Sequence, residues 1–575
     1  MRARTKVILI IIASFAVYLA GNGRVALWDR DEPRYAQTSR QMLHSGDWVV
    51  PHLLDKVRTA KPILIYWCQA SAMKVFGEKD FAARFPSAVA MTLMLIVLSI
   101  VIYRMIGARR AIWTVFVLST SGLAIAAAKM CLTDAVLMLF VTIAQVCLAI
   151  IYCANHNIFP PLPKGARWSL EMLDPDGAAR RGKRMTLVPV IMWIAIALAG
   201  LTKGPVVIGV SLTTMIVLAL FDASSKRSGF FVTRAIAWWR RTRPLIGIII
   251  LTIICAPWLI LIHKREPSFL PTILGHDVVE RMRTGLEGHK GPPGFYLLLI
   301  WATFFPWSLF LPATLVQAWK RRHIPIIRFA LAATIGPWIM FEIVRTKLPH
   351  YILPIFPMLA FLTADMLIRA DRKQHRDITS KVFVKIVAVW GAIVIGAACV
   401  PWISLKVFRP YINNIAIASM VVLTVLAIGY AIAIYHALRR ARPLLASAIM
   451  GSGMLLIVLV MYVGYLPNAS FLKTSQRIAG VLHEAHAIDP IMIDYKEDSL
   501  PWYEGGSIRS QRDNDFLLHN PPEAWPHYLV LTGEVRRRTP FDVQQKFEVL
   551  GGHPIRGFAY SDSGRIVDVF VLRKK

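Results

Sequence analysis

The first candidates for chemistry are charged residues that follow the first apolar segment, in the run Trp28-Asp-Arg-Asp-Glu-Pro-Arg-Tyr35. Asp31 and Glu32 lie just before an amphipathic stretch at 33–45, which predicts a short helix with Pro33 in its first turn. One explanation is structural: Asp31 caps this helix, and Glu32 is a first-turn acid that the helix dipole favours. The functional explanation is that a carboxylate here orients or deprotonates an acceptor, or binds a cationic substrate group.

A second external segment returns to the membrane as Lys61-Pro-Ile-Leu-Ile-Tyr-Trp67. Pro62 predicts the start of another interfacial helix, and Tyr66 and Trp67 are residues typical of the membrane interface. Lys61 stands at its N-terminal edge. Its side chain either extends towards lipid headgroups or contacts a phosphate group.

Further ionisable residues stand at the ends of other apolar segments, and each has an ordinary explanation as a helix cap or a loop charge. As a set they are less ordinary, because charges beside a membrane are costly and usually functional. Arginine binds phosphate oxygens in pairs and lysine supplies a point charge, so the set suits phosphate-linked sugars. The candidates are Arg34, Asp134, Lys203, Arg265, Arg281, Arg345, Lys347 and Tyr351.

No tight spacing of metal ligands, such as His-Glu-x-x-His, occurs in the sequence. We therefore assign no metal ligands and expect no required cofactor, while the use of a metal stays undecided.

Membrane residence follows from the composition: 56% of residues are hydrophobic and only 17% are charged. The mean hydropathy is +0.51. About 20 apolar residues span a bilayer as a helix. Thirteen segments meet or approach this length, near 7–22, 84–106, 110–128, 134–153, 186–201, 204–221, 244–262, 294–319, 325–344, 351–369, 382–401, 414–437 and 443–465.

Basic residues near the ends of spans orient the chain, because they favour the cytoplasmic side. With the N-terminus in the cytoplasm, the cytoplasmic segments hold 30 basic and six acidic residues, which accounts for most of the net charge of +32. The charge is therefore a topology signal, and nucleic acid is excluded as a partner. An odd number of spans places the C-terminus outside. Residues 466–575 hold fourteen bases and fourteen acids. They combine a helical stretch, 475–487, with β-rich runs at 491–495, 528–532, 547–550 and 566–572, which predicts a small α/β domain.

These residues give the chain a resemblance to a known family. Residues 1–370 resemble GT-C glycosyltransferases and, more closely, the aminoarabinose transferases of Gram-negative bacteria. The motifs that carry it are Asp31-Glu-Pro-Arg-Tyr-Ala36, Gly46-Asp-Trp-Val-Val-Pro51, Lys61-Pro62 with Tyr66-Trp67, Thr133-Asp134, Thr202-Lys-Gly204, Arg265-Glu-Pro267, and Lys347-Leu-Pro349 with Tyr351.

The resemblance implies an α-helical polytopic fold of GT-C type. Its catalytic domain would span residues 1–465, with periplasmic interfacial helices in 22–83 and a periplasmic loop at 263–293, and residues 466–575 would form a periplasmic domain. It also implies transfer of 4-amino-4-deoxy-L-arabinose from undecaprenyl phosphate to lipid A phosphates at the bacterial inner membrane, which confers resistance to polymyxin and other cationic peptides.

The resemblance also implies roles for single residues. Asp31 would be the key carboxylate, with Glu32 beside it, and Asp134 would be a second acid that orders Arg34. Lys61, Arg281 and the region of Lys347 would hold the phosphate of the carrier or the acceptor.

Two other readings of the same residues stay open. The Asp-Glu start is shared with protein O-mannosyltransferases, which also use a polyprenyl-phosphate sugar but need a general base for a hydroxyl acceptor. A transporter of lipid-linked sugar would favour charges at mid-membrane and internal repeats. Here the charges lie at external helix ends, and a purely structural membrane protein leaves them unexplained.

Overall fold

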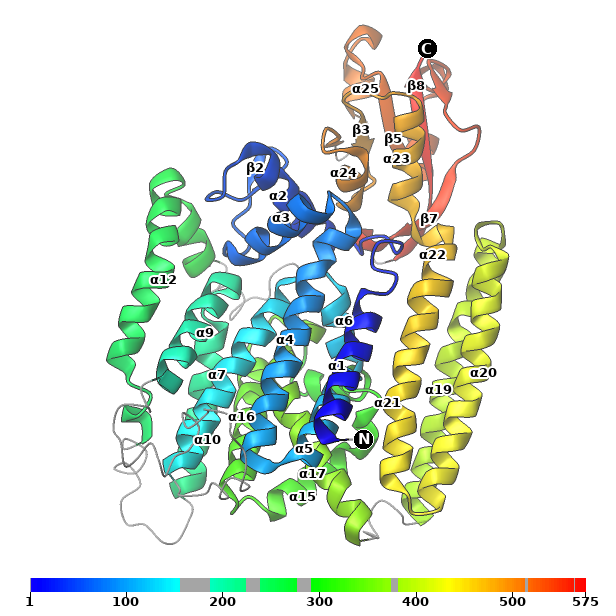
Figure 1. Cartoon of the computed structure of the whole chain (residues 1–575). Helices are drawn as coiled ribbons and strands as arrows, with labels where there is room; N and C mark the ends of the chain where they lie inside the picture. The colour runs from blue at the N-terminus through cyan, green and yellow to red at the C-terminus, as the bar shows by residue number, and fades with distance from the viewer. Residues whose placement is uncertain are drawn as a thin grey trace.

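Long apolar helices build most of the chain and run side by side in one bundle (Figure 1). The computed structural model describes residues 2–155, 187–223, 238–276, 291–373, 381–511, 515–562 and 564–575. Each of the thirteen predicted segments overlaps a helix. These helices are α1 (Ala3–Leu19), α4 (Asp80–Ile106), α5 (Ala108–Ser119), α6 (Gly122–Lys129), α7 (Thr133–Asn155), α9 (Leu187–Lys203), α10 (Val206–Ala223), α12 (Pro244–Arg265), α14 (Phe295–Thr303), α15 (Leu311–Lys320), α16 (Pro325–Ile343), α17 (Phe356–Lys373), α19 (Lys381–Phe408), α20 (Asn414–Arg439) and α21 (Pro443–Val460).

Nine helices in the described ranges are long and apolar enough to cross a membrane, and the bent pair α5–α6 makes a tenth if it is one span. The chain is therefore a multi-pass membrane protein, as predicted. The predicted span 294–319 differs from expectation, because it is broken into α14, the short helix η5 (Trp307–Phe310) and α15. Pro306 lies at this break and has no N–H to donate to a continuous helix.

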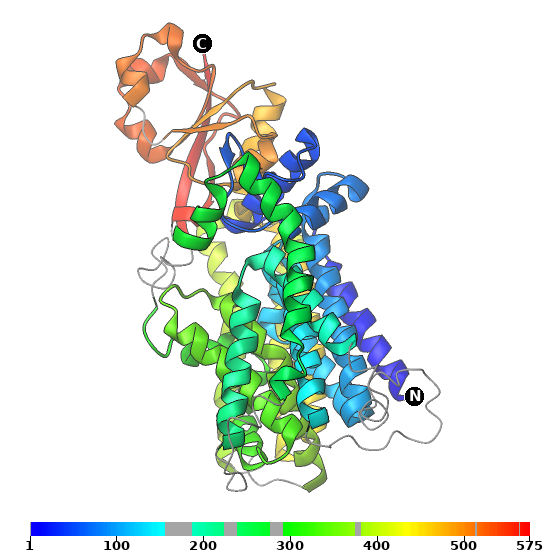
Figure 2. The same ribbon diagram turned by 90° about the vertical axis from the view of Figure 1, so that its left-hand side faces the viewer.

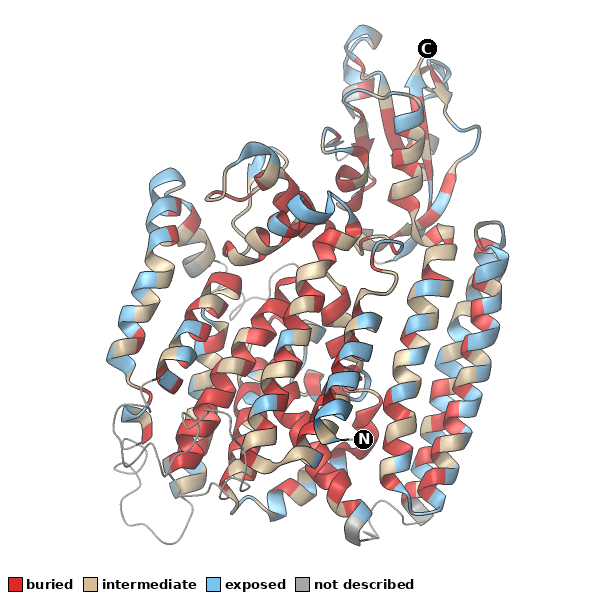
Figure 3. Cartoon of the chain, in the orientation of Figure 1, coloured by how far each residue is buried: buried red, intermediate tan, exposed pale blue. Residues whose placement is uncertain are grey.

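Burial separates inner from outer helices (Figure 3). Side chains of α7 and α17 are almost all buried, and those of α12 and α19 are mostly exposed. The exposed side chains are themselves apolar, for example Ile248 and Ile253 on α12 and Val389 and Ile393 on α19. An apolar surface of this extent fits contact with lipid rather than water.

Short elements lie over one end of the bundle. The helix expected at 33–45 is α2 (Asp31–Ser45), and the helix expected after Pro62 is α3 (Leu64–Phe76). Between them a small hairpin pairs β1 (His52–Leu53) with β2 (Lys56–Val57). Helix α2 ends where Gly46 takes a positive φ of 69°, a conformation that glycine adopts without strain.

Residues 466–575, here called the C-terminal region, form a six-stranded sheet with short helices. Strand β3 (Ile491–Ile493) runs parallel to β4 (Arg509–Gln511) and β5 (Tyr528–Thr532). Strand β8 (Arg565–Lys574) runs antiparallel to β5, β6 (Phe547–Val549) and β7 (Ile555–Ala559). Helix α23 (Thr474–Glu484) packs on this sheet through Ile478 and Leu482. The expected α/β character is confirmed, and β4, β7 and the helix α24 (Ser499–Glu504) are additions to the prediction.

The two termini lie at opposite ends of the molecule, and the C-terminal region stands over the same end as α2 and α3 (Figures 1 and 2). Segments from the start and the end of the chain therefore meet above the bundle.

Candidate active site

Ionisable residues from five separate segments gather at the end of the bundle that lies below α2. This charged cluster consists of Asp31, Lys61, Asp134, Lys203 and His350. Asp31 begins α2, Lys61 precedes α3, Asp134 lies in the first turn of α7, Lys203 ends α9, and His350 lies in the 3-10 helix η6 (Pro349–Ile355).

The Asp134–Lys203 ion pair is the centre of the charged cluster. Lys203 Nζ lies 2.7 Å from Asp134 Oδ1, and the two side chains are only 8% and 7% exposed. His350 Nε2 lies 3.8 Å from Asp134 Oδ2. Both charges suit their helices, because an acid is favoured at the start of α7 and a cation at the end of α9. The Nζ atom also lies 4.9 Å from the ring centroid of Tyr351.

Asp31 and Lys61 extend the charged cluster. Both act electrostatically on His350, and Lys61 also acts on Asp134. The Lys61 ammonium donates to the Ala60 carbonyl at 2.8 Å. Asp31 is exposed, and within the described ranges its carboxylate forms no hydrogen bond or ion pair. It is thus an accessible carboxylate next to two lysines and a histidine.

Arg58 is a further cation beside Asp31, which sequence reasoning missed. Its Nε donates to the Tyr66 hydroxyl at 2.9 Å, and its guanidinium lies 5.2 Å from the ring centroid of Tyr35. Burial raises the pKa of both tyrosines, so the phenols are neutral at pH 7 and the guanidinium carries the local charge. Among the described residues, the two terminal nitrogens of Arg58 have no hydrogen-bond partner. They are available to an anion.

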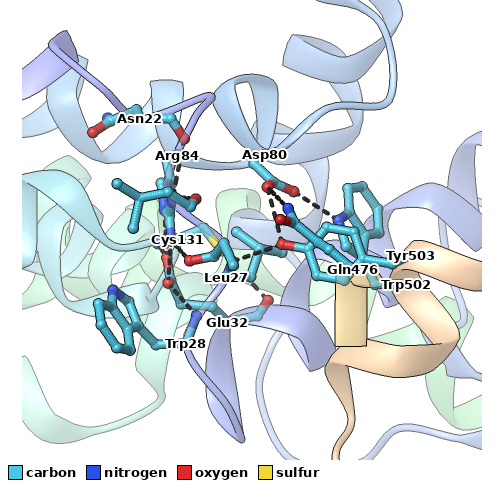
Figure 4. Close-up of polar contacts among 12 residues, drawn as sticks. Asn22, Leu27, Trp28, Glu32, Asp80, Arg84, Cys131, Gln476, Trp502 and Tyr503 are labelled. Carbon is cyan, nitrogen blue, oxygen red and sulfur yellow. Dashed lines mark hydrogen bonds and ion pairs between the residues drawn. The ribbon is translucent and has the colours of Figure 1, made fainter. Parts of the chain in front are cut away.

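Glu32 lies in a buried hydrogen-bond network (Figure 4). Its two oxygens accept from Arg84 Nε at 2.9 Å and Arg84 Nη2 at 2.7 Å, and both side chains have no exposed area. The same oxygens accept the backbone N–H groups of Trp28 and Cys131 at 2.9 and 2.7 Å. Arg84 also donates to the carbonyls of Asn22, Val25 and Ala26. Both Glu32 oxygens are therefore occupied by protein donors.

The remaining candidates lie in several places. Arg34 Nε is 2.7 Å from Asp498 of the C-terminal region, whereas the sequence analysis placed it beside Asp134. Lys347 is buried and 2.7 Å from Glu342, which also accepts the backbone N–H groups of Gly294 and Tyr296. Arg265 pairs with Asp47 at 2.9 Å, which links α12 to the loop after α2. Arg345 is exposed next to Lys347. Arg281 lies outside the described residues, as do residues 277–290 of the loop expected at 263–293.

Three residues near the site were missed for different reasons. His350 stands next to Tyr351 in the quoted motif, so its position was a usable signal. Arg84 begins a predicted span, and a charge in an apolar run was a usable signal as well. Arg58 lies in a polar hairpin where a base is unremarkable, and only the fold places it beside Asp31.

A pair of carboxyl groups marks the contact between the loop before α2 and the C-terminal region. Asp29 and Glu497 lie close enough for a hydrogen bond between their carboxyl groups. Glu497 is buried, and its Oε2 lacks any other partner. Burial raises the pKa of both groups, and the nearby Glu497 charge adds to the rise for Asp29. A single proton shared by the two carboxyl groups accounts for both the raised pKa values and the Glu497 Oε2 that lacks another partner.

This pair predicts a pH-dependent stability. Because the pKa values are raised in the folded protein, folding favours the protonated form. That stabilisation is complete below the pKa of the groups in the unfolded chain, about 4. It is lost as the pH rises through the higher pKa that the groups have in the folded protein. Replacing Glu497→Gln supplies a permanent donor, so we expect the variant to be more stable than the wild type at pH 8 by roughly 1.5–3 kcal/mol, the usual worth of a hydrogen bond to a charged group.

The measurement is the thermal unfolding of both proteins in detergent between pH 5 and pH 8. The difference between them should shrink towards pH 5. A matched control is Glu548→Gln, which lies in an exposed ion pair with Arg573 on the same sheet. A difference that stays constant with pH would contradict the shared proton.

The fold and the site together define a class: a polytopic helical membrane protein with charged residues at one end of its bundle, below an α/β region. The structure matches the crystal structure of ArnT from Cupriavidus metallidurans bound to undecaprenyl phosphate with a TM-score of 0.74 and 22% sequence identity, covering 99% of this chain and 98% of that chain. The apo state of the same protein matches with a TM-score of 0.73 and 21% identity.

Sequence comparison adds particular relatives. Undecaprenyl phosphate-alpha-4-amino-4-deoxy-L-arabinose arabinosyl transferase 2 of Proteus mirabilis is 27% identical over 64% of this chain and 61% of its own length. The transferase of Serratia proteamaculans is 29% identical over 62% of this chain and 58% of its own length. The matched part thus spans about 60% of these relatives. Residues 60–158 match the model for dolichyl-phosphate-mannose-protein mannosyltransferase. The resemblance that the motifs indicated is confirmed.

Proposed function

We propose that this protein is a glycosyltransferase that moves 4-amino-4-deoxy-L-arabinose from undecaprenyl phosphate to phosphate groups of lipid A. The observation that carries the proposal is the charged cluster, where an exposed carboxylate, Asp31, stands among Lys61, Lys203 and Arg58. Such a site suits two phosphate groups, one on the lipid carrier and one on the acceptor, together with an amino sugar. The similarity to proteins named for this transfer supports the choice of sugar and carrier.

The acceptor phosphate is already anionic near neutral pH, so transfer needs little base catalysis. Positioning and stabilisation of the leaving lipid phosphate then supply most of the rate. In this scheme a phosphate oxygen of the acceptor attacks the anomeric carbon in a single displacement with inversion, and the bond to the carrier phosphate breaks. Asp31 orients the acceptor or binds the sugar's ammonium group.

Other residues take supporting roles in the proposal. Lys61 and Arg58 bind phosphate, and the Asp134–Lys203 pair keeps a lysine fixed at the edge of the site. Glu32 positions Asp31 through Arg84 rather than touching substrate, because both its oxygens are occupied. Lys347 is likewise held by a protein partner, Glu342, and has a structural role rather than a contact with substrate.

The proposed location is the bacterial inner membrane with the N-terminus in the cytoplasm. Residues 1–465 then form the membrane domain, and the charged cluster and residues 466–575 face the periplasm. The distribution of basic residues and the opposite positions of the termini support this orientation.

The test is mass spectrometry of lipid A from cells with and without the gene, grown under conditions that induce lipid A modification. We expect a mass increase that matches added aminoarabinose only when the gene is present. Lipid A of identical mass in both strains, with the protein present in the membrane, would contradict the proposal.

A second candidate is transfer of a polyprenyl-phosphate sugar to a protein hydroxyl. The match of residues 60–158 to the mannosyltransferase model favours it. It requires a general base, for which Asp31 is the available carboxylate. Incubating purified protein with a labelled lipid-linked sugar and either lipid A or a serine-rich peptide separates the two candidates by where the label goes.

Arg58 provides a prediction for donor binding. Replacing Arg58→Ala removes a forked cation beside Asp31, so we expect the KM for the lipid-linked donor to rise about 10- to 100-fold, which corresponds to roughly 1.5–3 kcal/mol for a charge-assisted hydrogen bond. Arg58→Lys keeps the charge but loses the forked pair of N–H donors, so its KM should lie between those of the wild type and Arg58→Ala. The measurement is initial rate against donor concentration.

Lys56→Ala is the matched control, because Lys56 is exposed in the same hairpin and faces no charged partner in the described ranges. Its KM should equal that of the wild type. An Arg58→Ala protein with unchanged KM would remove Arg58 from the phosphate site.

A further inference from the structure

The C-terminal region holds the first turn of α2 through two consecutive residues at the start of α24. Asp498 Oδ2 accepts a hydrogen bond from Arg34 Nε at 2.7 Å. Ser499 donates its N–H to Asp29 Oδ1 at 2.8 Å and its hydroxyl to Asp29 Oδ2. Asp29 and Arg34 lie two residues before and three residues after Asp31. Both flanks of the exposed carboxylate are therefore tied to α24.

Helix α24 is itself fixed to the bundle by independent contacts. Trp502 Nε1 and the Tyr503 hydroxyl donate to the Asp80 carboxylate at the start of α4, at 2.8 and 2.9 Å (Figure 4). Arg40 of α2 donates to the carbonyls of Trp502 and Pro501 at 2.9 and 3.1 Å and lies 4.6 Å from the Trp502 ring centroid. Because α24 contacts both helices, it sets the place of α2 relative to α4.

Asp31 has no protein partner of its own in the described part of the chain, so its position depends on its neighbours. Below it, Glu32 is fixed to Arg84. Above it, Asp29 and Arg34 are fixed to α24. The carboxylate is thus held at a point between the membrane bundle and the C-terminal region, by contacts on both sides.

We propose that Asp498 and Ser499 are positioning residues, which fix the place and direction of the Asp31 carboxylate for sugar transfer. This inference rests on the proposed function. A displacement of about 1 Å at a reacting group can cost about 100-fold in rate. A partly exposed ion pair contributes only about 0–1 kcal/mol to stability, and the Arg34 and Asp498 side chains are 23% and 29% exposed. Loss of the contact should therefore reduce turnover far more than folding.

The test uses the full-length protein in lipid nanodiscs with aminoarabinosyl undecaprenyl phosphate as donor and lipid A as acceptor. For Asp498→Ala and Ser499→Ala we expect kcat to fall about 10- to 100-fold, with the KM for donor within about twofold of the wild type. Asp498→Glu keeps the ion pair and should recover most of the rate. The control Glu548→Gln, on the edge strand β6 of the sheet, should match the wild type.

A second measurement needs no donor. In Asp498→Ala, amide hydrogen exchange in residues 31–37 should be faster than in the wild type, while exchange in α7 and the thermal midpoint stay the same. Wild-type protein that transfers no sugar to lipid A overturns the proposed function. A wild type that transfers normally, with an Asp498→Ala variant of equal kcat or with a loss of folded protein that accounts for the whole decrease, overturns the positioning role.

Discussion

Replacement of Asp31→Asn is expected to reduce sugar transfer about 100- to 1,000-fold or more, the range for loss of one electrostatic contact to a reacting group. The change removes one negative charge and keeps the size and shape of the side chain. In the structure this carboxylate is exposed, lies beside Lys61, Arg58 and His350, and is bonded to no other described residue. Its charge therefore serves no visible structural purpose.

Stability should change little. An exposed first-turn acid contributes about 0.3–1 kcal/mol through the helix dipole, so the thermal midpoint of the variant should lie within a few degrees of the wild type. The assay is the rate of sugar transfer to lipid A by purified protein, alongside thermal unfolding of the same sample.

Asp55→Asn is the matched control, because Asp55 is an exposed acid in the neighbouring hairpin turn. It should transfer sugar at the wild-type rate. Normal transfer by Asp31→Asn would remove this carboxylate from the mechanism. A second result would be informative as well: if activity is lost only at low donor concentration, Asp31 binds substrate in its ground state rather than acting in the transition state.

Replacement of Glu32→Gln should have the opposite profile, a large loss of stability. Each Glu32 oxygen accepts one Arg84 nitrogen and one backbone N–H, of Cys131 or of Trp28. A glutamine has one carbonyl oxygen, so its NH₂ group must face two of these donors. The Arg84 guanidinium would also stay buried without its counter-charge. Breaking a buried ion pair on one side typically costs about 3–5 kcal/mol.

The expected observation is a clear decrease in the thermal midpoint or a loss of monodisperse protein in detergent. Glu78→Gln is the control, since Glu78 pairs with His44 at an exposed position. A Glu32→Gln protein of wild-type stability that fails to transfer sugar would mean that Glu32 acts on substrate, and the structural role would be wrong. Arg84→Met, which leaves Glu32 buried without its counter-charge, should be destabilised to a similar degree.

Prediction from the sequence was strongest where the property is local. Each of the thirteen apolar segments contains helix, because apolar length and helix formation both depend on neighbouring residues. The segment 294–319 shows the limit of prediction from apolar length. Its composition is apolar throughout, and its break at Pro306 depends on how the chain packs there. In the C-terminal region the alternating runs predicted four strands, while β4 and β7 were missed because β4 reads Arg-Ser-Gln without an apolar residue and β7 contains Gly557.

The sequence indicated candidate site residues by their type and place, but their partners were not predictable from it. Asp134 and Lys203 are 69 positions apart, and nothing in either motif indicates that α7 and α9 pack together. Arg34 pairs with Asp498 rather than Asp134, because the C-terminal region folds back over α2. Contacts of this kind are set by the packing of distant elements.

Asp31 and Glu32 show most clearly which properties are local to the sequence and which depend on the packing of distant elements. Their position at the start of a helix beside the membrane could be predicted from the sequence, because charge, helix-start residues and apolar length are properties of short segments. Their different surroundings depend on tertiary packing, which buries Glu32 against Arg84 and leaves Asp31 exposed in the charged cluster. Neighbouring helical residues point about 100° apart, so the surrounding helices decide which acid meets protein and which is left accessible to a substrate.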